Sequence, residues 1–591
     1  MNEPTRLFDC IDLLLAQGPK PDLLAAKMKG EWRKFSTVEV KETVESLAAG
    51  LLKLGLGYND GTVEGRDKVA VISRNRPEWL ILDLAVQEVG AILVPVYPTI
   101  NTAELEFIMN DAQVKIIFVN DQDAFEKVSL VRSGVPSLLH LYSFEEMNDV
   151  QHWRQLVVKD ELSKPQLAEV KNKIRKDDVV TIIYTSGTTG TPKGVMLSHD
   201  NILGNVLACV PCLPADNLKA LSFLPLNHIF ERMISYFYLY KGASIYYAES
   251  METIGDNLKE VKPNIFTTVP RLLEKVYDKI MAKGADLTGV KRKLFFWAHD
   301  LAIRYEINKN QGPWYNMQLA LANKLIFSKW REALGNNLLC IVSGGAACQV
   351  RLIRIFTAAK IPILEGYGLT ETSPVISVNR YEEEHRMFGT VGPVIENVQV
   401  RINDDGEILC KGPNVMVGYY KRPDLTAEVI VNGWFHTGDI GTLVEEKYLK
   451  ITDRKKEMFK TSGGKYVAPL PIENKLKESI FIEQVMIIGA DKKFVGALIV
   501  PSFGNLKDWV KQKGLHATSN EHLINLPEVK EMFKDLIENF NKSFNHVEQV
   551  KRFELLSSEW TIEGGEMTPK LSLKRKVVMD KNADVITRIY R

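Results

Sequence analysis

Short apolar runs rich in β-branched residues recur along most of this chain, separated by helical patterns and brief loops. KVAVIS (68–73), AILVPVYP (91–98) and KIIFVND (115–121) each predict a buried strand. Residues 74–90 predict an amphipathic helix that ends at Gly90. Further strands are predicted within 220–226, 243–249, 264–270, 338–345 and 361–368. This alternation indicates an α/β fold whose sheets are buried on both faces, with ligands bound at the carboxyl ends of the strands.

The length of the chain predicts more than one domain, because 591 residues exceed what a single hydrophobic core accommodates. The sequence changes character near Asp453, where a basic, glycine-bearing segment (453–469) begins. After it we expect a helix at 471–479, strands at 484–490 and 495–501, and a charged helical region to the end. We therefore predict a large N-terminal domain of stacked α/β sheet layers (1–454) and a small α+β C-terminal domain on a hinge (455–591).

Composition narrows the class of protein. The formal net charge of +1 argues against nucleic acid as the main partner, since proteins that bind phosphate backbones usually carry a clear basic excess. The first residues place acidic side chains inside the apolar stretch, so we expect no secretory signal. We find no apolar run approaching the roughly 20 residues that span a bilayer. We expect a cytoplasmic protein, and peripheral contact with the inner face of the membrane stays open.

Six cysteines in so long a chain fit a reducing compartment better than a disulfide scaffold. Cys209 and Cys212 form a CxxC pair. A zinc site would need two further ligands at similar spacing, and a redox site would need a thioredoxin-like setting. Because neither pattern is visible, we interpret the pair as structural.

The segment YTSGTTGTPKGV (184–195) combines glycines, hydroxyl side chains and one lysine between two predicted strands, 179–184 and 193–199. Exposed backbone N–H groups, hydroxyl donors and a cation together suit a polyphosphate. The segment is not a P-loop, because Pro192 precedes Lys193 and Gly194 follows it. We expect a strand–loop–strand arrangement, after which Ser198 caps the next helix.

Two positions in the later part of the chain suit a nucleotide. Asp439 lies on a glycine turn and could accept both hydroxyls of a ribose, although a solvent-facing turn Asp is the simpler interpretation when it is taken alone. Arg454 could grip the same ribose. Tyr367 lies between Gly366 and Gly368, which would clear space for an adenine against the ring.

Two further side chains leave alternatives open. Glu371 suits Mg²⁺ as a hard oxygen ligand, or it is a buried structural carboxylate. It also occupies the third glycine position of a dinucleotide-binding pattern, which excludes that fingerprint. His228 alone would most simply be a core histidine.

The glycine-rich segment closely resembles the phosphate-binding signature of the acyl-adenylate-forming enzymes, which include acyl-CoA synthetases, beetle luciferases and the adenylation domains of peptide synthetases. Five more segments resemble that family in its order: LPLNHIFER (224–232), SGGAA (343–347), EGYGLTET (365–372), GWFHTGDIG (433–441) and DRKKEMFK (453–460). The resemblance covers nearly the whole chain. It is greatest to the long-chain fatty acyl-CoA synthetase branch.

The resemblance implies roles for residues at matching positions. The phosphates of ATP would be held by Thr185, Ser186, Gly187, Thr188, Thr189, Gly190 and Lys193. The adenine and magnesium segments would contribute Gly344, Gly345, Ala346, Gly366, Tyr367, Gly368, Thr370 and Glu371. Asp439 and Arg454 would bind the ribose, and Thr185 and Glu371 the Mg²⁺. Lys193, His228, Glu371 and Lys574 would be the catalytic residues, with His228 at the mouth of the acyl pocket and Lys574 five residues after Pro569. Lys456 would be the hinge, and Lys460 and Gly464 would contact the pantetheine of coenzyme A.

The implied activity is ATP-dependent ligation of a fatty acid to coenzyme A through an acyl-adenylate, with Mg²⁺ as cofactor. The two half-reactions would use different faces of the C-terminal domain. The preference for long chains rests on the resemblance alone. Two alternatives remain: an adenylating enzyme that acts on an aromatic acid or passes its acyl group to a carrier protein, and a silent acyl- or nucleotide-binding protein.

Overall fold

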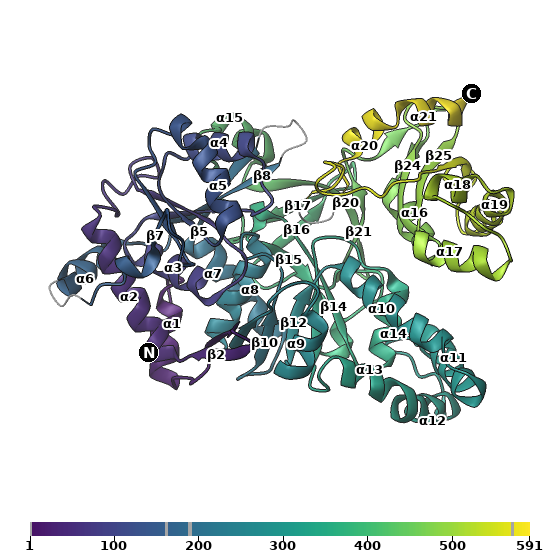
Figure 1. Cartoon of the computed structure of the whole chain (residues 1–591), viewed down its shortest axis with the longest axis horizontal. Helices are drawn as coiled ribbons and strands as arrows, with labels where there is room; N and C mark the ends of the chain where they lie inside the picture. The colour runs from purple at the N-terminus through teal and green to yellow at the C-terminus, as the bar shows by residue number, and fades with distance from the viewer. Residues whose placement is uncertain (1–2, 160–162, 187–191, 569–572) are drawn as a thin grey trace.

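The computed structural model describes residues 3–159, 163–186, 192–568 and 573–591. Within these ranges, two eight-stranded sheets and one five-stranded sheet form the larger part of the molecule. The last strands and helices form a smaller body beside them (Figure 1). No helix of the described ranges combines the length and the apolar character needed to cross a membrane.

The first eight-stranded sheet holds the glycine-rich segment at one edge. Its spatial order is β18 (Gly418–Tyr419), β9 (Pro192–Ser198), β8 (Val179–Ser186), β4 (Ile92–Val96), β3 (Lys68–Ile72), β5 (Val114–Val119), β6 (His140–Ser143) and β7 (Gln151–His152). The strands from β8 to β7 are parallel, whereas β9 and β18 are antiparallel additions. β3 and β4 are buried along their whole length. The predicted strands at 68–73, 91–98 and 115–121 are therefore confirmed, as are the two strands predicted on either side of the glycine-rich segment.

The second eight-stranded sheet is also mainly parallel, with antiparallel strands at its two edges. Its order is β15 (Val375–Val378), β14 (Ile363–Gly368), β13 (Cys340–Ser343), β12 (Ile265–Thr268), β10 (Lys219–Ser222), β11 (Ser244–Tyr247), β1 (Leu24–Met28) and β2 (Glu31–Phe35). All five strand patterns expected between residues 220 and 368 belong to it.

The largest hydrophobic core joins the two sheets through the helices between them. It includes strand residues of both sheets and side chains of α3 (Pro77–Glu88), α7 (His199–Cys209) and α8 (Ile229–Tyr240). Every residue of α3 is buried, so the prediction of an amphipathic helix was wrong. A helix enclosed on all sides needs no polar face, and its charged residues are paired instead, as Asp83 is with Arg232 of α8 at 2.6 Å. Ser198 caps α7 as predicted.

The other helices of the larger part pack against the sheets or connect their strands. They are α1 (Asp9–Gln17), α2 (Thr37–Lys53), α4 (Thr102–Asp111), α5 (Gln122–Val131), α6 (Ser163–Lys173), α9 (Ile254–Val261), α10 (Pro270–Ala285), α11 (Gly289–Ile303), α12 (Pro313–Ala322), α13 (Ser328–Ala333), α14 (Val350–Ala358) and α15 (Pro423–Val429). Of these, α1, α2 and α6 add side chains to the largest hydrophobic core.

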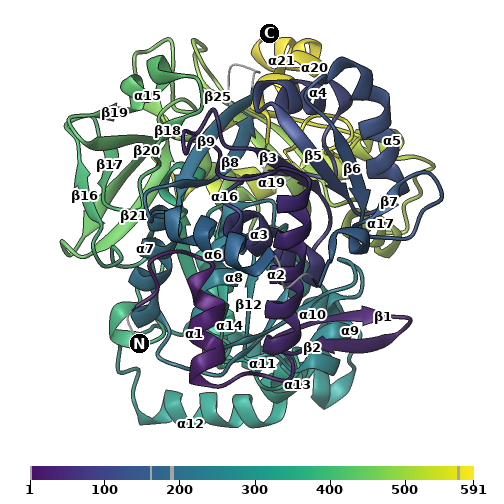
Figure 2. The same cartoon turned by 90° about the vertical axis from the view of Figure 1, so that its left-hand side faces the viewer.

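The third sheet is antiparallel and lies on one flank, beside β18 and β9 (Figure 2). It consists of β16 (Gln399–Ile402), β17 (Glu407–Lys411), β20 (Trp434–Val444), β19 (Ile430–Val431) and β21 (Tyr448–Arg454). The chain passes from the end of β21 directly into the smaller body.

The smaller body is α+β, as predicted. Its strands are β22 (Phe459–Lys460), β23 (Tyr466–Val467), β24 (Ile482–Ile488), β25 (Val495–Pro501) and β26 (Val550–Leu555). Its helices are α16 (Pro469–Leu476), α17 (Phe503–Gln512), α18 (Asn520–Asn525), α19 (Pro527–Asn541), α20 (Arg575–Lys581) and α21 (Ala583–Tyr590). The prediction of only helices after residue 501 was wrong at β26. This strand pairs with β25 alone, and its exposed edge carries charges that mask the strand pattern.

Candidate active site

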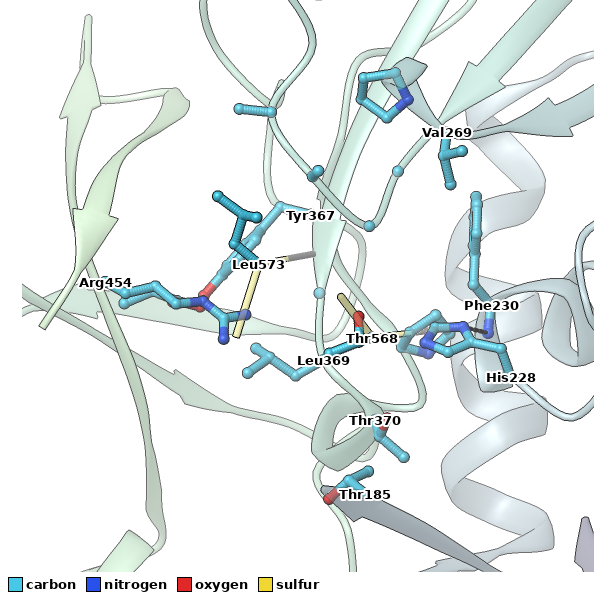
Figure 3. A pocket seen from close by; sticks show the side chains of 18 of the residues that line it. Thr185, His228, Phe230, Val269, Tyr367, Leu369, Thr370, Arg454, Thr568 and Leu573 are labelled. Carbon is cyan, nitrogen blue, oxygen red and sulfur yellow. Dashed lines mark hydrogen bonds and ion pairs between the residues drawn. The ribbon is translucent and has the colours of Figure 1, made fainter. Parts of the chain in front are cut away.

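A cavity of about 2760 Å³ opens where the strand ends of both large sheets face the third sheet and the smaller body. Residues just after or at the carboxyl ends of the parallel strands line it, among them Tyr97, Asp121, Thr185, Val269 and Gly344. This is the position that the strand pattern predicts for a ligand. Figure 3 shows the cavity with Arg454 on one side and His228 with Phe230 on the opposite side.

Asp439, Arg454 and Tyr367 meet at one wall of this cavity. Asp439 on β20 lies directly opposite Arg454 on β21 in the strand register, and Tyr367 reaches them from β14. The Tyr367 hydroxyl donates a hydrogen bond of 2.6 Å to Asp439 Oδ2, while Arg454 Nε lies 3.4 Å from Oδ1. The backbone pairing of β20 with β21 therefore holds the acid and the base together.

Burial governs the chemistry of this cluster. It raises the pKa of the Asp439 carboxyl, and the positive charge of Arg454 opposes that change. Burial and the neighbouring Asp439 raise the pKa of Tyr367 well above its usual value, so the phenol remains a donor. A carboxylate offers about four lone-pair positions. Tyr367 and Arg454 occupy only part of them, which leaves Asp439 able to accept hydrogen bonds from ligand hydroxyls.

Lys193 and Glu371 are linked through a tyrosine that the sequence did not suggest. The Lys193 ammonium lies 5.1 Å from the centre of the Tyr419 ring, a cation–π distance. The Tyr419 hydroxyl donates to Glu371 Oε1 at 2.9 Å. Thr185 is paired with Lys193 across β8 and β9. All four residues line the cavity, which thus combines one cation with hydroxyl and carboxylate oxygens.

The donor set of this corner fits a magnesium ion shared with a nucleotide. In the described part of the chain, no three His, Cys, Asp or Glu side chains form a metal site by themselves. Mg²⁺ usually takes one or two protein oxygens and completes its shell with phosphates and water. Glu371 and Thr185 provide that number of oxygens.

The glycines that line the cavity are needed there for different structural reasons. A Cβ at Gly368 would lie 1.7 Å from the carbonyl oxygen of Pro374, so the residue allows β14 and β15 to pack closely and does not simply clear room for a ligand. Gly345 has a φ of +80° and a Cβ there would meet little, so its backbone lies open to the cavity. Gly344, Ala346, Gly366 and Thr370 line the cavity as well.

Glu365 is a buried acid on the cavity wall that sequence reasoning missed. Its Oε1 accepts a hydrogen bond of 2.7 Å from the backbone N–H of Cys348, and burial raises its pKa to about 7. The available signal was one carboxylate within the apolar strand pattern ILEGYG.

His228 begins an apolar path along α8. It caps the helix, with its Nδ1 accepting a hydrogen bond of 3.1 Å from the Phe230 N–H. In the neutral ring the proton therefore lies on Nε2. Phe230, Ile234 and Phe237 follow on the cavity side at helical spacing. The path from His228 to Phe237 rises about 13 Å at 1.5 Å per residue.

Both cysteines of the CxxC pair lie beside this path. Cys209 and Cys212 are buried, carry no disulfide and line the cavity near Leu213 and Val375. Both also belong to the largest hydrophobic core.

The smaller body contributes Lys574 to the cavity. Its backbone N–H donates to the Glu566 carbonyl at 2.7 Å, which fixes the start of α20. Lys456 lies in the turn after β21 and also lines the cavity, whereas Lys460 and Gly464 do not. Lys460 packs its ammonium 5.6 Å from the Tyr466 ring.

Direct contacts hold the smaller body in this orientation. Arg271 of α10 forms an ion pair with Glu483 of β24. The Gln349 side-chain amide donates to the Lys477 carbonyl at 3.3 Å. Where β21 leads into the smaller body, Asp453 Oδ2 accepts a hydrogen bond of 3.2 Å from the Leu470 N–H.

Some predicted residues are not described. Gly187, Thr188, Thr189 and Gly190 lie outside the described residues, and only the backbone of Ser186 is described, as the end of β8.

Comparison with known proteins agrees with the class that this fold and cavity define, an AMP-binding enzyme. Residues 16–420 match the AMP-binding enzyme family and residues 457–591 match the AMP-binding enzyme C-terminal domain. The chain belongs to this family, in its long-chain acyl-CoA synthetase branch.

Curated relatives match the chain over nearly its full length. It is 32% identical to the long-chain-fatty-acid–CoA ligase FadD15 of Mycobacterium tuberculosis, over 95% of this chain and 93% of that protein. It is 31% identical to long chain acyl-CoA synthetase 3 of Arabidopsis thaliana, over 99% and 92%.

Solved structures share the fold at lower sequence identity. The anthranilate CoA ligase AuaEII, solved with anthranoyl-AMP, has a TM-score of 0.73 at 16% identity, over 99% of this chain and 98% of that one. The adenylation domain of a carboxylate reductase from Mycobacterium chelonae has a TM-score of 0.75 at 20% identity, over 100% and 92%.

Proposed function

We propose that this protein joins a long-chain fatty acid to coenzyme A at the expense of ATP, releasing pyrophosphate and AMP. The observation that carries the proposal is the composition of one cavity. Its Asp439–Arg454–Tyr367 wall suits the ribose of a nucleotide, and the apolar path that begins at His228 suits an acyl chain. The curated relatives are named for the same reaction.

A carboxylate needs activation before a thiol can displace one of its oxygens. In the first half-reaction a carboxylate oxygen attacks the α-phosphorus of ATP, and the bond to pyrophosphate breaks. In the second, the coenzyme A sulfur attacks the acyl carbon, AMP leaves with the oxygen, and the thiol proton passes to solvent. No side chain becomes acylated, so catalysis consists of positioning and charge stabilisation.

Three polar side chains support this chemistry from different walls of the cavity. Lys193, held against Tyr419, would attract the departing pyrophosphate. Lys574 would neutralise charge between the carboxylate and the α-phosphate. The Nε2–H of His228 would orient the carboxylate at the start of the apolar path.

We include Mg²⁺ as the cofactor, held by Glu371 and Thr185 together with phosphate oxygens. When bound, it would neutralise negative charge on the phosphates. The hydrogen bond from the Tyr419 hydroxyl to Oε1 fixes the orientation of the Glu371 carboxylate.

We propose that the domain boundary falls between residues 454 and 455 and that Lys456 is the hinge. Supporting this, β21 ends at Arg454 and the separate C-terminal core begins after it. In the present orientation Lys574 lines the cavity, whereas Lys460 and Gly464 do not. This is the orientation that adenylation needs, and rotation about the hinge would bring the other face toward coenzyme A.

A cytoplasmic location completes the proposal. All six cysteines are buried thiols without disulfides, as a reducing compartment maintains them.

The test is a panel of carboxylic acids assayed for both AMP release and coenzyme A consumption. Long-chain fatty acids should give equal amounts of AMP and acyl-CoA, with shorter chains less efficient because each buried methylene adds about 0.8 kcal/mol. Acyl-adenylate formation without coenzyme A consumption would favour a carrier protein as acceptor. A preference for aromatic acids, or no pyrophosphate release with any acid, would refute the proposal.

A further inference from the structure

An apolar stripe lies on the outer edge of the larger domain, and none of its residues lines the cavity described above. α12 continues through one π-helical turn, η4 (Asn323–Phe327), into α13. In both views this segment lies at the lower edge of the molecule (Figures 1 and 2). The stripe consists of Trp314, Met317, Leu321 and Leu325, which are 68%, 56%, 48% and 43% exposed.

The spacing of these residues, three and then four, puts them on one helical face. A surface helix normally turns its polar side to water, so an outward apolar face needs an explanation. Eighteen large apolar side chains are exposed in the described part of the chain, and six of them lie between Val290 and Leu325.

Contacts on the opposite side prevent the helix from turning to hide the stripe. The Tyr315 hydroxyl donates to the Leu301 carbonyl at 2.8 Å. The Asn323 side-chain amide donates to the Ala358 carbonyl at 2.9 Å. Phe327 and Trp330 pack edge to face, with their ring centres 4.9 Å apart, inside a second hydrophobic core that also contains side chains of α10, α11 and α14. The orientation of the stripe is therefore fixed by buried groups.

Positive charge surrounds the stripe. Residues 289–333 contain eight Lys and Arg against three Asp and Glu, an excess of five, whereas the whole chain has a formal net charge of +1. α11 packs against α12 and η4, and Lys291 and Lys293 of α11 and Lys324 of η4 are all exposed. Val290, in the first turn of α11, is 72% exposed. We call this combination of α11, α12 and η4 the α11–α12 face.

We propose that the α11–α12 face docks on the surface of a lipid bilayer that contains anionic headgroups. Tryptophan and aliphatic side chains with lysines around them are the composition of interfacial helices. The apolar stripe would enter the boundary between headgroups and acyl chains, and the lysines would meet the anionic headgroups. Docking does not depend on the proposed function, but it would bring the enzyme to the phase in which long-chain fatty acids dissolve.

A second copy of the chain fits this face less well. Pairing two such faces would bring two basic clusters together, which is unfavourable. Nucleic acid would match the charge but not the four exposed apolar side chains.

Sedimentation of the full-length protein with vesicles tests the proposal. Vesicles of phosphatidylcholine with phosphatidylglycerol should bind the protein, and those of phosphatidylcholine alone should bind it several-fold more weakly. The double variant Trp314→Gln/Leu321→Gln should lose at least about tenfold in partitioning. Lys291→Gln/Lys293→Gln should lose up to about fivefold per charge, only on anionic vesicles and less at high salt.

The matched control is Leu130→Gln/Leu139→Gln, which changes two apolar residues that are 75% and 60% exposed elsewhere. Its partitioning should equal that of the unaltered protein. Adenylation of a water-soluble short-chain acid, measured without vesicles, should be unchanged in every variant and shows that each is folded. Equal vesicle binding by the Trp314→Gln/Leu321→Gln variant would overturn the proposal. So would a dimer of the unaltered protein that this variant dissociates.

Discussion

The ion pair between Arg271 and Glu483 joins the two domains, and its removal should change the two half-reactions unequally. The side chains are 28% and 25% exposed, so solvent screens the pair in part. A partly exposed ion pair contributes up to about 1 kcal/mol. That free energy corresponds to about a fivefold change in the balance between two domain orientations. Arg271→Ala should therefore slow acyl-adenylate formation by up to about fivefold.

The second half-reaction provides the contrast. Thioester formation from supplied acyl-adenylate uses the other orientation, so Arg271→Ala should leave its rate unchanged or raise it. The assays are ATP–pyrophosphate exchange for the first step and acyl-CoA formation from acyl-adenylate for the second. Because Glu274 lies 3.1 Å from Arg271, Arg271→Glu alone should slow the first step more than Arg271→Ala does.

Two further variants make the reasoning refutable. The exchange Arg271→Glu combined with Glu483→Arg should recover much of the lost exchange rate, since it restores the cross-domain attraction. Lys534→Ala, which removes an exposed ion pair within the smaller domain, should change neither step. Equal slowing of both half-reactions by Arg271→Ala would show that the pair supports the fold and not one orientation.

Three other predictions concern the cavity. Lys574→Ala should slow adenylation roughly 10²–10³-fold and affect thioester formation from supplied acyl-adenylate much less; equal loss in both would exclude its assigned role. Asp439→Asn should weaken ATP binding about tenfold or more in a direct binding assay while the affinity for fatty acid is kept, because the amide replaces a charged acceptor by a neutral one. Glu365→Gln should raise the midpoint of thermal unfolding more at pH 8 than at pH 5. Since the pKa of Glu365 rises to about 7 in the folded protein, its ionisation opposes folding as the pH increases from about 4.5 to 7, by at most about 3 kcal/mol. An equal shift at both pH values would contradict this.

The sequence predicted the strands well because each one is a short buried run between turn residues. β3, β4 and β9 needed no tertiary information. The errors have a tertiary cause in each case. α3 looked amphipathic, yet its charged residues are buried and paired between two sheets. β26 has only one neighbour strand, so half of its side chains kept the charges of a surface segment.

The candidate site was predictable as a set of segments but not as a set of contacts. Nothing in the residues around Tyr419 indicates that it would connect Lys193 with Glu371, since the three lie on different segments of the chain. The sequence likewise does not indicate the close approach of Pro374 to Gly368. The assigned roles of Lys574, His228 and the ribose-binding residues remain predictions, which the variants above test.

The β20–β21 ribbon has a consequence for the order of events in a catalytic cycle. Arg454 ends this ribbon beside Asp439, and the chain turns into the smaller domain within the next two residues. A nucleotide bound by Arg454 would thus contact the segment that leads directly into the smaller domain. Linked equilibria are reciprocal, so any domain orientation that binding of a nucleotide favours must in return tighten the hold on that nucleotide. Release of AMP must therefore favour the return of the domain to its starting orientation, and that return must in turn weaken the binding of AMP.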